Sequence, residues 1–144
     1  MQSTKTVAVA AAVAAALAGT SYAASVGVSA LAGKATVAPP TLYKVTKKSG
    51  QTLRGSNRND TLLGGPGPDH LYGLAGNDVI NGAGGNDWLY GGPGRDVVSG
   101  GPGNDHIYTR DGERDIVDGG PGFDIAYVDR FDVVRNVERV YRTH

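Results

Sequence analysis

A nine-residue period runs through the middle of this chain, and it limits the possible fold more than any other feature of the sequence. From Gly55 onward, eight consecutive units carry Asp at their sixth position, and seven of the eight begin with Gly. The eighth position is apolar in every unit, so an acidic and an apolar residue keep a fixed phase up to Tyr127. Such short-period self-similarity is typical of a solenoid, in which each repeat packs only on its neighbours.

The repeat departs from its pattern at a few positions. One inserted residue near Asp111 shifts the frame and weakens the seventh unit. Arg58 and Glu113 replace the glycine that usually stands at position four, and Ala126 is a small occupant of the apolar position.

The period predicts short strands joined by tight turns. Positions seven to nine form a strand whose middle residue points inward, and the glycines of the first six positions permit the turn. Two units then make one coil of 18 residues, with parallel strands roughly 4.8 Å apart. The predicted core consists of the residues at position eight, which are Leu62, Leu71, Ile80, Leu89, Val98, Ile107 and Val117.

Stacked coils align the aspartates into two columns of like charge. One column contains Asp60, Asp78, Asp96 and Asp115, and the other contains Asp69, Asp87, Asp105 and Asp124. A hard cation relieves this repulsion, and calcium accepts six to eight oxygens from carboxylates and backbone carbonyls alike. Magnesium is the weaker candidate because it demands tight octahedral geometry. We therefore expect calcium in the turns.

This motif resembles the repeats-in-toxin (RTX, hemolysin-type) calcium-binding family, whose repeat is GGxGxDxUx. The resemblance covers about half of the chain. It implies an all-β, right-handed parallel β-roll of about eight nonapeptide repeats with short caps at both ends, and roughly four to six calcium ions between successive turns. The ligands implied are the eight aspartates above together with Gly64, Gly67, Gly73, Gly76, Gly82, Gly85, Gly91, Gly94, Gly100 and Gly103.

The first residues predict export of the chain. Lys5, the apolar run 7–18 and the small residues before Ala24 are typical of a signal peptide at 1–23, with cleavage after Ala32 as the alternative. The run is shorter than the ~20 residues that span a membrane, so no stable membrane insertion is expected. With no cysteine in the chain, disulfides cannot stabilise the fold. We expect a flexible leader at 24–50, the roll at 51–127 and a C-terminal cap at 128–144.

Charge and motif content bear on the class of function. Residues 24–54 contain Lys and Arg but no acid, whereas residues 55–127 contain ten Asp and one Glu against four Arg. No Ser/His/Asp set, phosphate loop or H-E-x-x-H motif stands out, and the stretch before the first repeat is too short for a catalytic domain. We therefore expect no enzyme activity and no nucleic-acid partner.

One outer face of the predicted roll is aromatic. It carries Tyr72, Trp88, Tyr90 and Tyr108, one coil apart along each column, with His70 and His106 on either side of Trp88. The aromatics either stabilise the stacked strands, lie under the leader or tail, or bind a polysaccharide or protein partner. The histidines are two coils apart, roughly 9.6 Å, and cannot share an ion.

These features together predict a secreted calcium-binding protein with a structural or interaction role at or outside the cell envelope. The alternatives are an adhesion module that uses the aromatic face, and a non-catalytic accessory module related to RTX enzymes.

Overall fold

The computed structural model describes residues 43–45 and 50–144, which form twelve short strands and no helix. The strands are β1 (Tyr43–Val45), β2 (Thr52–Arg54), β3 (Thr61–Leu63), β4 (His70–Tyr72), β5 (Val79–Asn81), β6 (Trp88–Tyr90), β7 (Val97–Ser99), β8 (His106–Tyr108), β9 (Ile116–Asp118), β10 (Ile125–Val128), β11 (Val133–Arg135) and β12 (Arg139–Arg142). Within these residues no helix could cross a membrane.

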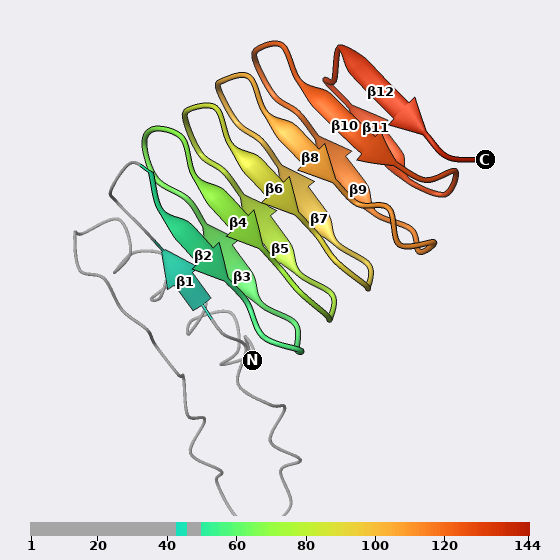
Figure 1. Cartoon of the computed structure of the whole chain (residues 1–144), viewed down its shortest axis with the longest axis horizontal. Helices are drawn as coiled ribbons and strands as arrows, with labels where there is room; N and C mark the ends of the chain where they lie inside the picture. The colour runs from blue at the N-terminus through green and yellow to red at the C-terminus, as the bar shows by residue number, and fades with distance from the viewer. Residues whose placement is uncertain (1–42, 46–49) are drawn as a thin grey trace, which may run out of the picture.

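The strands alternate between two parallel sheets of six, as expected for a β-roll (Figure 1). Odd-numbered strands form one sheet and even-numbered strands form the other, so each coil contributes one strand to each. Thr61 pairs with Val79, which confirms the 18-residue coil. Val97 pairs with Ile116, so the predicted insertion lengthens that coil to 19 residues.

The roll extends beyond the eight predicted units, which correspond to β3 through β10. Strand β1 pairs with β3, and it lies in the segment that the sequence predicts as a leader. Strands β11 and β12 pair with β9 and β10, so the expected C-terminal cap continues both sheets. The predicted signal peptide and the leader residues 24–42 and 46–49 lie outside the described residues.

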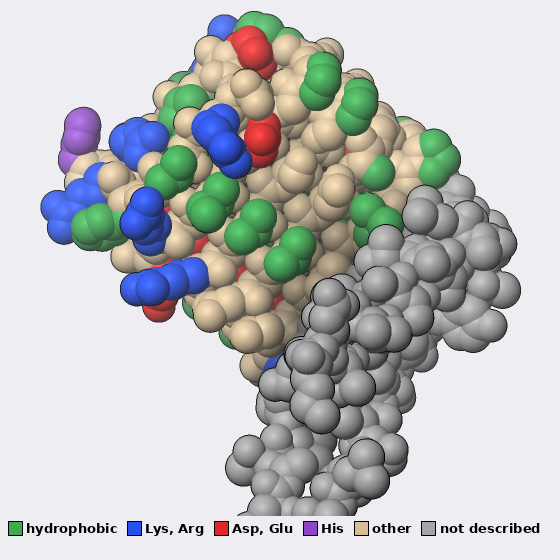
Figure 2. All heavy atoms as spheres, turned by 180° about the vertical axis from the view of Figure 1, so that it is seen from behind, with side chains coloured by type: hydrophobic (Ala, Val, Ile, Leu, Met, Phe, Trp, Pro, Cys, Tyr) green, Lys and Arg blue, Asp and Glu red, His purple; other side chains and the backbone are tan. Residues whose placement is uncertain are grey.

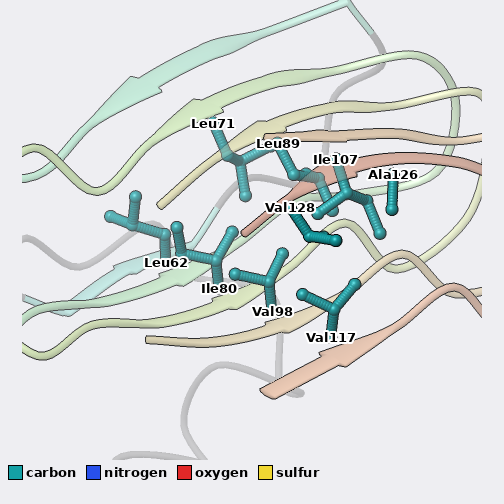
Figure 3. Close-up of a cluster of buried hydrophobic side chains, with 9 residues drawn as sticks. All are labelled: Leu62, Leu71, Ile80, Leu89, Val98, Ile107, Val117, Ala126 and Val128. Atoms are coloured by element: carbon teal, nitrogen blue, oxygen red, sulfur yellow. The ribbon is translucent and has the colours of Figure 1, made fainter. Parts of the chain in front are cut away.

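A single file of apolar side chains from each sheet fills the space between the sheets (Figure 3). All seven predicted core residues are at most 1% exposed, and Ala126 is buried beside them. Leu53, Val134 and Val137 are partly buried and pack against this core. The alternation of strand faces therefore places the residue at position eight inward in every unit.

Val128 is a core residue that the repeat does not predict. It stands where the preceding units have their first glycine, and it is fully buried. At six of the seven position-one glycines, a Cβ would collide with the carbonyl of the next coil. Strand β12 pairs alongside β10 with Arg142 opposite Val128, and at this level the core accommodates a valine side chain in place of the glycine.

The C-terminal end of the roll is basic. Arg130, Arg135, Arg139 and Arg142 are all exposed, and basic side chains gather at this end in Figure 2. The outer edge of β12 is unpaired in the described structure, and charged side chains on such an edge oppose pairing with other strands.

Replacing Leu89 by Ala tests the assignment of the inner face. Leu89 is fully buried, so we expect the calcium-loaded protein to lose about 2 to 5 kcal/mol of unfolding free energy. Val97 is 43% exposed on the outer face, and Val97→Ala should cost about 1 kcal/mol or less. Urea denaturation in excess calcium measures both, and equal losses would contradict the assignment.

Candidate metal centre

The eight repeat aspartates form two buried columns, as the period predicts. We call Asp60, Asp78, Asp96 and Asp115 the odd column and Asp69, Asp87, Asp105 and Asp124 the even column, after the sheets whose strands they precede. Each is at most 1% exposed.

A hydrogen bond of the same kind joins each pair of stacked aspartates. The Asp60 N–H donates to Asp78 Oδ1 at 2.7 Å, and the Asp87 N–H donates to Asp105 Oδ1 at 2.8 Å. The remaining pairs repeat this contact along both columns. One oxygen of each carboxylate is therefore committed to joining two coils.

The second carboxylate oxygen is different, because in six of the eight aspartates it has no partner. These buried orphan atoms are Oδ2 of Asp78, Asp87, Asp96, Asp105, Asp115 and Asp124. An unsatisfied buried polar atom costs about 1 to 3 kcal/mol, and more when it is charged. A bound cation would remove this cost at each position.

The first two aspartates have protein donors instead. Asp60 Oδ2 accepts from the Ser56 N–H, and Asp69 Oδ2 accepts from the Gly65 N–H at 2.8 Å. Both donors occupy position two of their units. The structure thus separates Asp60 and Asp69 from the other six predicted ligands.

Backbone conformation at position two accompanies this difference. Leu74 and Ala83 hold the same position in the third and fourth units, and they have φ angles of 84° and 78°. Ser56 and Gly65 are not in this left-handed region. A left-handed non-glycine residue costs about 1 to 3 kcal/mol, and such strain concentrates at functional sites. In this chain, the strained residues Leu74 and Ala83 belong to the units in which the aspartate Oδ2 lacks a main-chain donor.

The position-one glycines lie where a carboxylate and a carbonyl oxygen converge. A Cβ on Gly82 would lie 2.6 Å from the Gly100 carbonyl oxygen and even closer to Asp87 Oδ2. The same pair of atoms, the unit's own Oδ2 and the next coil's carbonyl, faces Gly55, Gly64, Gly73, Gly100 and Gly119. These sites provide the oxygen ligands that calcium prefers.

The position-four glycines serve the close approach of successive turns. A Cβ on Gly85 would lie 2.5 Å from the Gly67 carbonyl oxygen, and Gly76, Gly94 and Gly103 face the turn before them in the same way. No side chain fits between the turns at these four positions.

The insertion disturbs the odd column at one level. A Cβ on Gly91 would lie 2.4 Å from Asp96 Oδ2, but no carbonyl of the next coil would lie within 3.5 Å of it. The Gly94 N–H, whose counterparts donate to a carbonyl, donates instead to Asp111 Oδ2 at 2.8 Å. The side chain of Asp111 therefore replaces a backbone acceptor in this turn.

Two acidic residues that the repeat analysis missed continue the columns. The Asp115 N–H donates to Asp132 Oδ1 at 3.0 Å, and the Asp124 N–H donates to Glu138 Oε2 at 2.8 Å. Both follow their predecessors at spacings shorter than the regular coil. The segment beginning at Asp132, an Asp followed by two Val, nevertheless matches the segment at Asp96 and could have revealed the first of them.

Burial shifts the titration of these carboxyls upward. Desolvation is the main cause, and it raises the pKa of Asp78 and Asp87 from 3.8 to about 6. It raises the pKa of Asp96, Asp105 and Asp115 to about 7. Backbone hydrogen bonds lower these pKa values and neighbouring acids raise them, but burial outweighs the hydrogen bonds.

The described residues contain no group of three or more His, Asp or Glu side chains that could hold a metal ion. A site of this kind must therefore combine one or two carboxylates with backbone carbonyls.

The aromatic face consists of rings stacked on one another. Tyr72, Tyr90, Tyr108, Tyr127 and Tyr141 form a ladder with centroids 4.7 to 4.9 Å apart. His70, Trp88 and His106 stack in a second column, and Arg54 covers the outer face of Tyr72. The inner rings of each ladder have both faces covered, so the surface presents mainly ring edges. Sugar stacking requires an open ring face, and this geometry offers few.

Raised pKa values predict an unusual pH dependence for the calcium-free protein. A carboxyl whose folded pKa lies above its unfolded pKa stabilises the fold below about pH 4, and this contribution is lost as pH rises through about 6 to 7. Calcium-free protein should therefore be less stable at about pH 7.5 than at about pH 5, and calcium should reverse the order. Urea denaturation at both pH values, with and without chelator, measures this; pH-independent stability without calcium would contradict it.

Gly82→Ala tests the position-one cradle against a matched glycine of the same turn. The added methyl would collide with Asp87 Oδ2 and the Gly100 carbonyl, so we expect loss of calcium affinity. A Cβ on Gly84 would lie no closer than 4.0 Å to the nearest neighbouring atom, and Gly84→Ala should bind calcium as the unchanged protein does. Calcium titration of both variants provides the measurement, and similar affinities would contradict the cradle.

Comparison with known families agrees with the geometry of the turns. The family model of the RTX calcium-binding nonapeptide repeat (4 copies) matches residues 54–89, 82–113 and 90–126, which together cover half of the chain. Comparisons with curated proteins and with solved structures give no match. The chain belongs to the RTX calcium-binding nonapeptide repeat family.

Proposed function

We propose that this protein is a secreted β-roll whose fold is completed by calcium, with a structural or interaction role at or outside the cell envelope and no catalytic activity. The observation that carries the proposal is the set of six buried carboxylate oxygens without a hydrogen-bond partner. Protein donors satisfy the other oxygens of the two columns, so these six mark where a cation is needed.

The ligand chemistry favours calcium over other cations. Each cradle combines a carboxylate oxygen with a backbone carbonyl oxygen, and neither sulfur nor imidazole takes part. Calcium accepts such mixed oxygen sets at flexible geometry, whereas magnesium keeps its waters and requires an octahedron.

The number of ions follows from the completeness of the cradles. Of the six orphan oxygens, those of Asp78, Asp87, Asp105 and Asp124 each share a cradle with a carbonyl of the next turn. Asp96 and Asp115 border the insertion, where this carbonyl is missing or the first glycine is replaced. We infer four to six bound ions, with the four complete cradles as the strongest sites.

These ions would supply much of the stability of the roll. With a dissociation constant of ~0.1 mM, ~1 mM calcium adds about 1.4 kcal/mol for each site. Roughly four to six sites then contribute about 6 to 8 kcal/mol, which is comparable with the whole stability of a small domain. Without calcium, the carboxylates of the two columns are buried with no cation beside them. Their burial then favours either protonation of the carboxyls or unfolding of the roll.

Export suits a protein of this kind, because calcium is scarce in the cytoplasm and abundant outside the cell. The signal peptide predicted at 1–23 is the support for this part of the proposal. Mass spectrometry of the protein recovered from the medium tests it, with Ala24 or Gly33 as the expected first residue. A full-length chain retained inside the cell would contradict it.

Asp105→Asn should weaken calcium-induced folding. The amide can keep the hydrogen bond from the Asp87 N–H but removes the charge from a complete cradle. We expect this variant to need a higher calcium concentration than the unchanged protein to reach the full strand signal in circular dichroism. The concentration should be about tenfold higher if one site is lost.

Glu113→Gln is the matched control, because Glu113 is exposed and pairs with Arg95 outside the columns. It should fold at the calcium concentration that the unchanged protein requires, and magnesium should not replace calcium for any of the three proteins. A strand signal that chelator leaves unchanged would refute calcium-dependent folding.

A further inference from the structure

The two columns end differently at the C-terminal end of the roll. In the odd column, protein donors satisfy both oxygens of Asp132. Its Oδ2 accepts from the Asp129 N–H at 2.9 Å and from the Thr109 hydroxyl at 3.1 Å. The Arg142 guanidinium donates to the carbonyls of Asp129 and Asp132 at 2.9 and 3.2 Å. This end is closed by the protein itself and leaves no oxygen for an ion.

The even column ends open. Asp124 is fully buried, and its Oδ2 has no partner. Its N–H donates to Glu138 Oε2 at 2.8 Å, which is the contact that an aspartate of the next coil makes everywhere else in the column. Glu138 therefore takes the place of the next repeat aspartate, with a side chain one methylene longer.

A cradle of the repeat type lies at the same level. A Cβ on Gly119 would meet both Asp124 Oδ2 and the carbonyl oxygen of Asn136. This is the pair of atoms found at Gly82 and Gly100, where the carbonyl comes from the first glycine of the unit one coil later. At the end of the roll, Asn136 takes the place of that glycine.

The conformation of Asn136 explains how a short connection achieves this. Its φ angle is 49°, in the left-handed region that Asn tolerates better than most side chains. Its Nδ2 donates to Asp118 Oδ1 at 2.8 Å, which anchors the turn to the preceding coil. The chain thus returns to β12 without a complete repeat and still presents a carbonyl to the cradle.

We propose that Asp124, the Asn136 carbonyl and Glu138 form a terminal calcium site, two of whose three residues lie beyond the repeats. Glu138 uses one oxygen for the Asp124 N–H, and in the proposed site its second oxygen binds the ion. The proposal rests on the proposed calcium function, and it adds ligands that the nonapeptide motif does not contain. The family match ends at residue 126, before both Asn136 and Glu138.

This site would couple calcium to the order of the cap. Asn136 and Glu138 precede β12 directly, so an ion held between them and Asp124 ties this strand to the roll. Without the ion, the Glu138 and Asp124 carboxylates repel each other, and this repulsion contributes to the raised pKa of Asp124 behind the larger effect of burial.

Glu138→Gln isolates the charge of the terminal ligand. The amide oxygen still accepts from the Asp124 N–H, but the carboxylate is lost. Calorimetric titration of the full chain should show one calcium ion fewer than for the unchanged protein. Hydrogen exchange in calcium should rise across 133–144 and stay unchanged across 70–126. Glu113→Gln is the matched control, because Glu113 is exposed and pairs with Arg95 away from the cradle, and it should keep the full ion count.

An unchanged ion count and unchanged exchange in Glu138→Gln would overturn the terminal site while leaving the repeat sites intact. Absence of calcium binding by the unchanged protein would instead refute the proposed function itself. If Glu138→Gln has a reduced strand signal in excess calcium, Glu138→Asp is titrated in its place. Glu138→Asp keeps the charge on a shorter side chain, so the protein should bind the full number of ions with weaker affinity at one site. Unchanged affinity at every site would overturn the proposal.

Discussion

The structure depends on buried aspartates, each of which connects two neighbouring coils through its carboxylate. From Asp78 to Asp124, Oδ1 of each repeat aspartate accepts the backbone N–H of the aspartate one coil earlier, and this contact sets the vertical spacing of the turns. The second oxygen lies beside the first glycine of its own unit, at the gap toward the next coil, and in six units it has no protein donor. A fold that buries rows of carboxylates in this way is favourable only if protons or cations neutralise them.

The gap between successive coils also requires glycine, both because it leaves no room for a side chain and because of the backbone conformation of the turn. At position one, any side chain would fill the volume between the aspartate and the carbonyl of the next coil. Each sheet contributes a single row of side chains to the apolar core, so few hydrophobic residues hold the two sheets together (Figure 3). A roll of this thickness needs the cation contribution more than a globular domain does.

The ends of the roll reveal how the repeat is started and stopped. At the first two units, main-chain N–H groups of Ser56 and Gly65 occupy the carboxylate oxygen that is open elsewhere. At the last odd turn, Thr109 and Arg142 supply donors from outside the repeat. The turns with an orphan carboxylate oxygen thus lie between turns in which protein donors satisfy that oxygen, except where the even column ends at Glu138. The tyrosine ladder runs from β4 to β12 of the even sheet and adds stacking between coils on the outside, where the ions cannot act.

The sequence by itself determined the coil, the inward residues and the two aspartate columns, because a strict nine-residue period allows only one phase between strand, turn and core. It also identified the insertion near Asp111, which lengthens one coil as expected. Only the tertiary structure separated Asp60 and Asp69 from the six aspartates with an orphan oxygen, since that difference lies in one backbone angle at position two. It alone brought Asp132 and Glu138 into the columns, because shortened connections remove the period while hydrogen bonding through space preserves the contact.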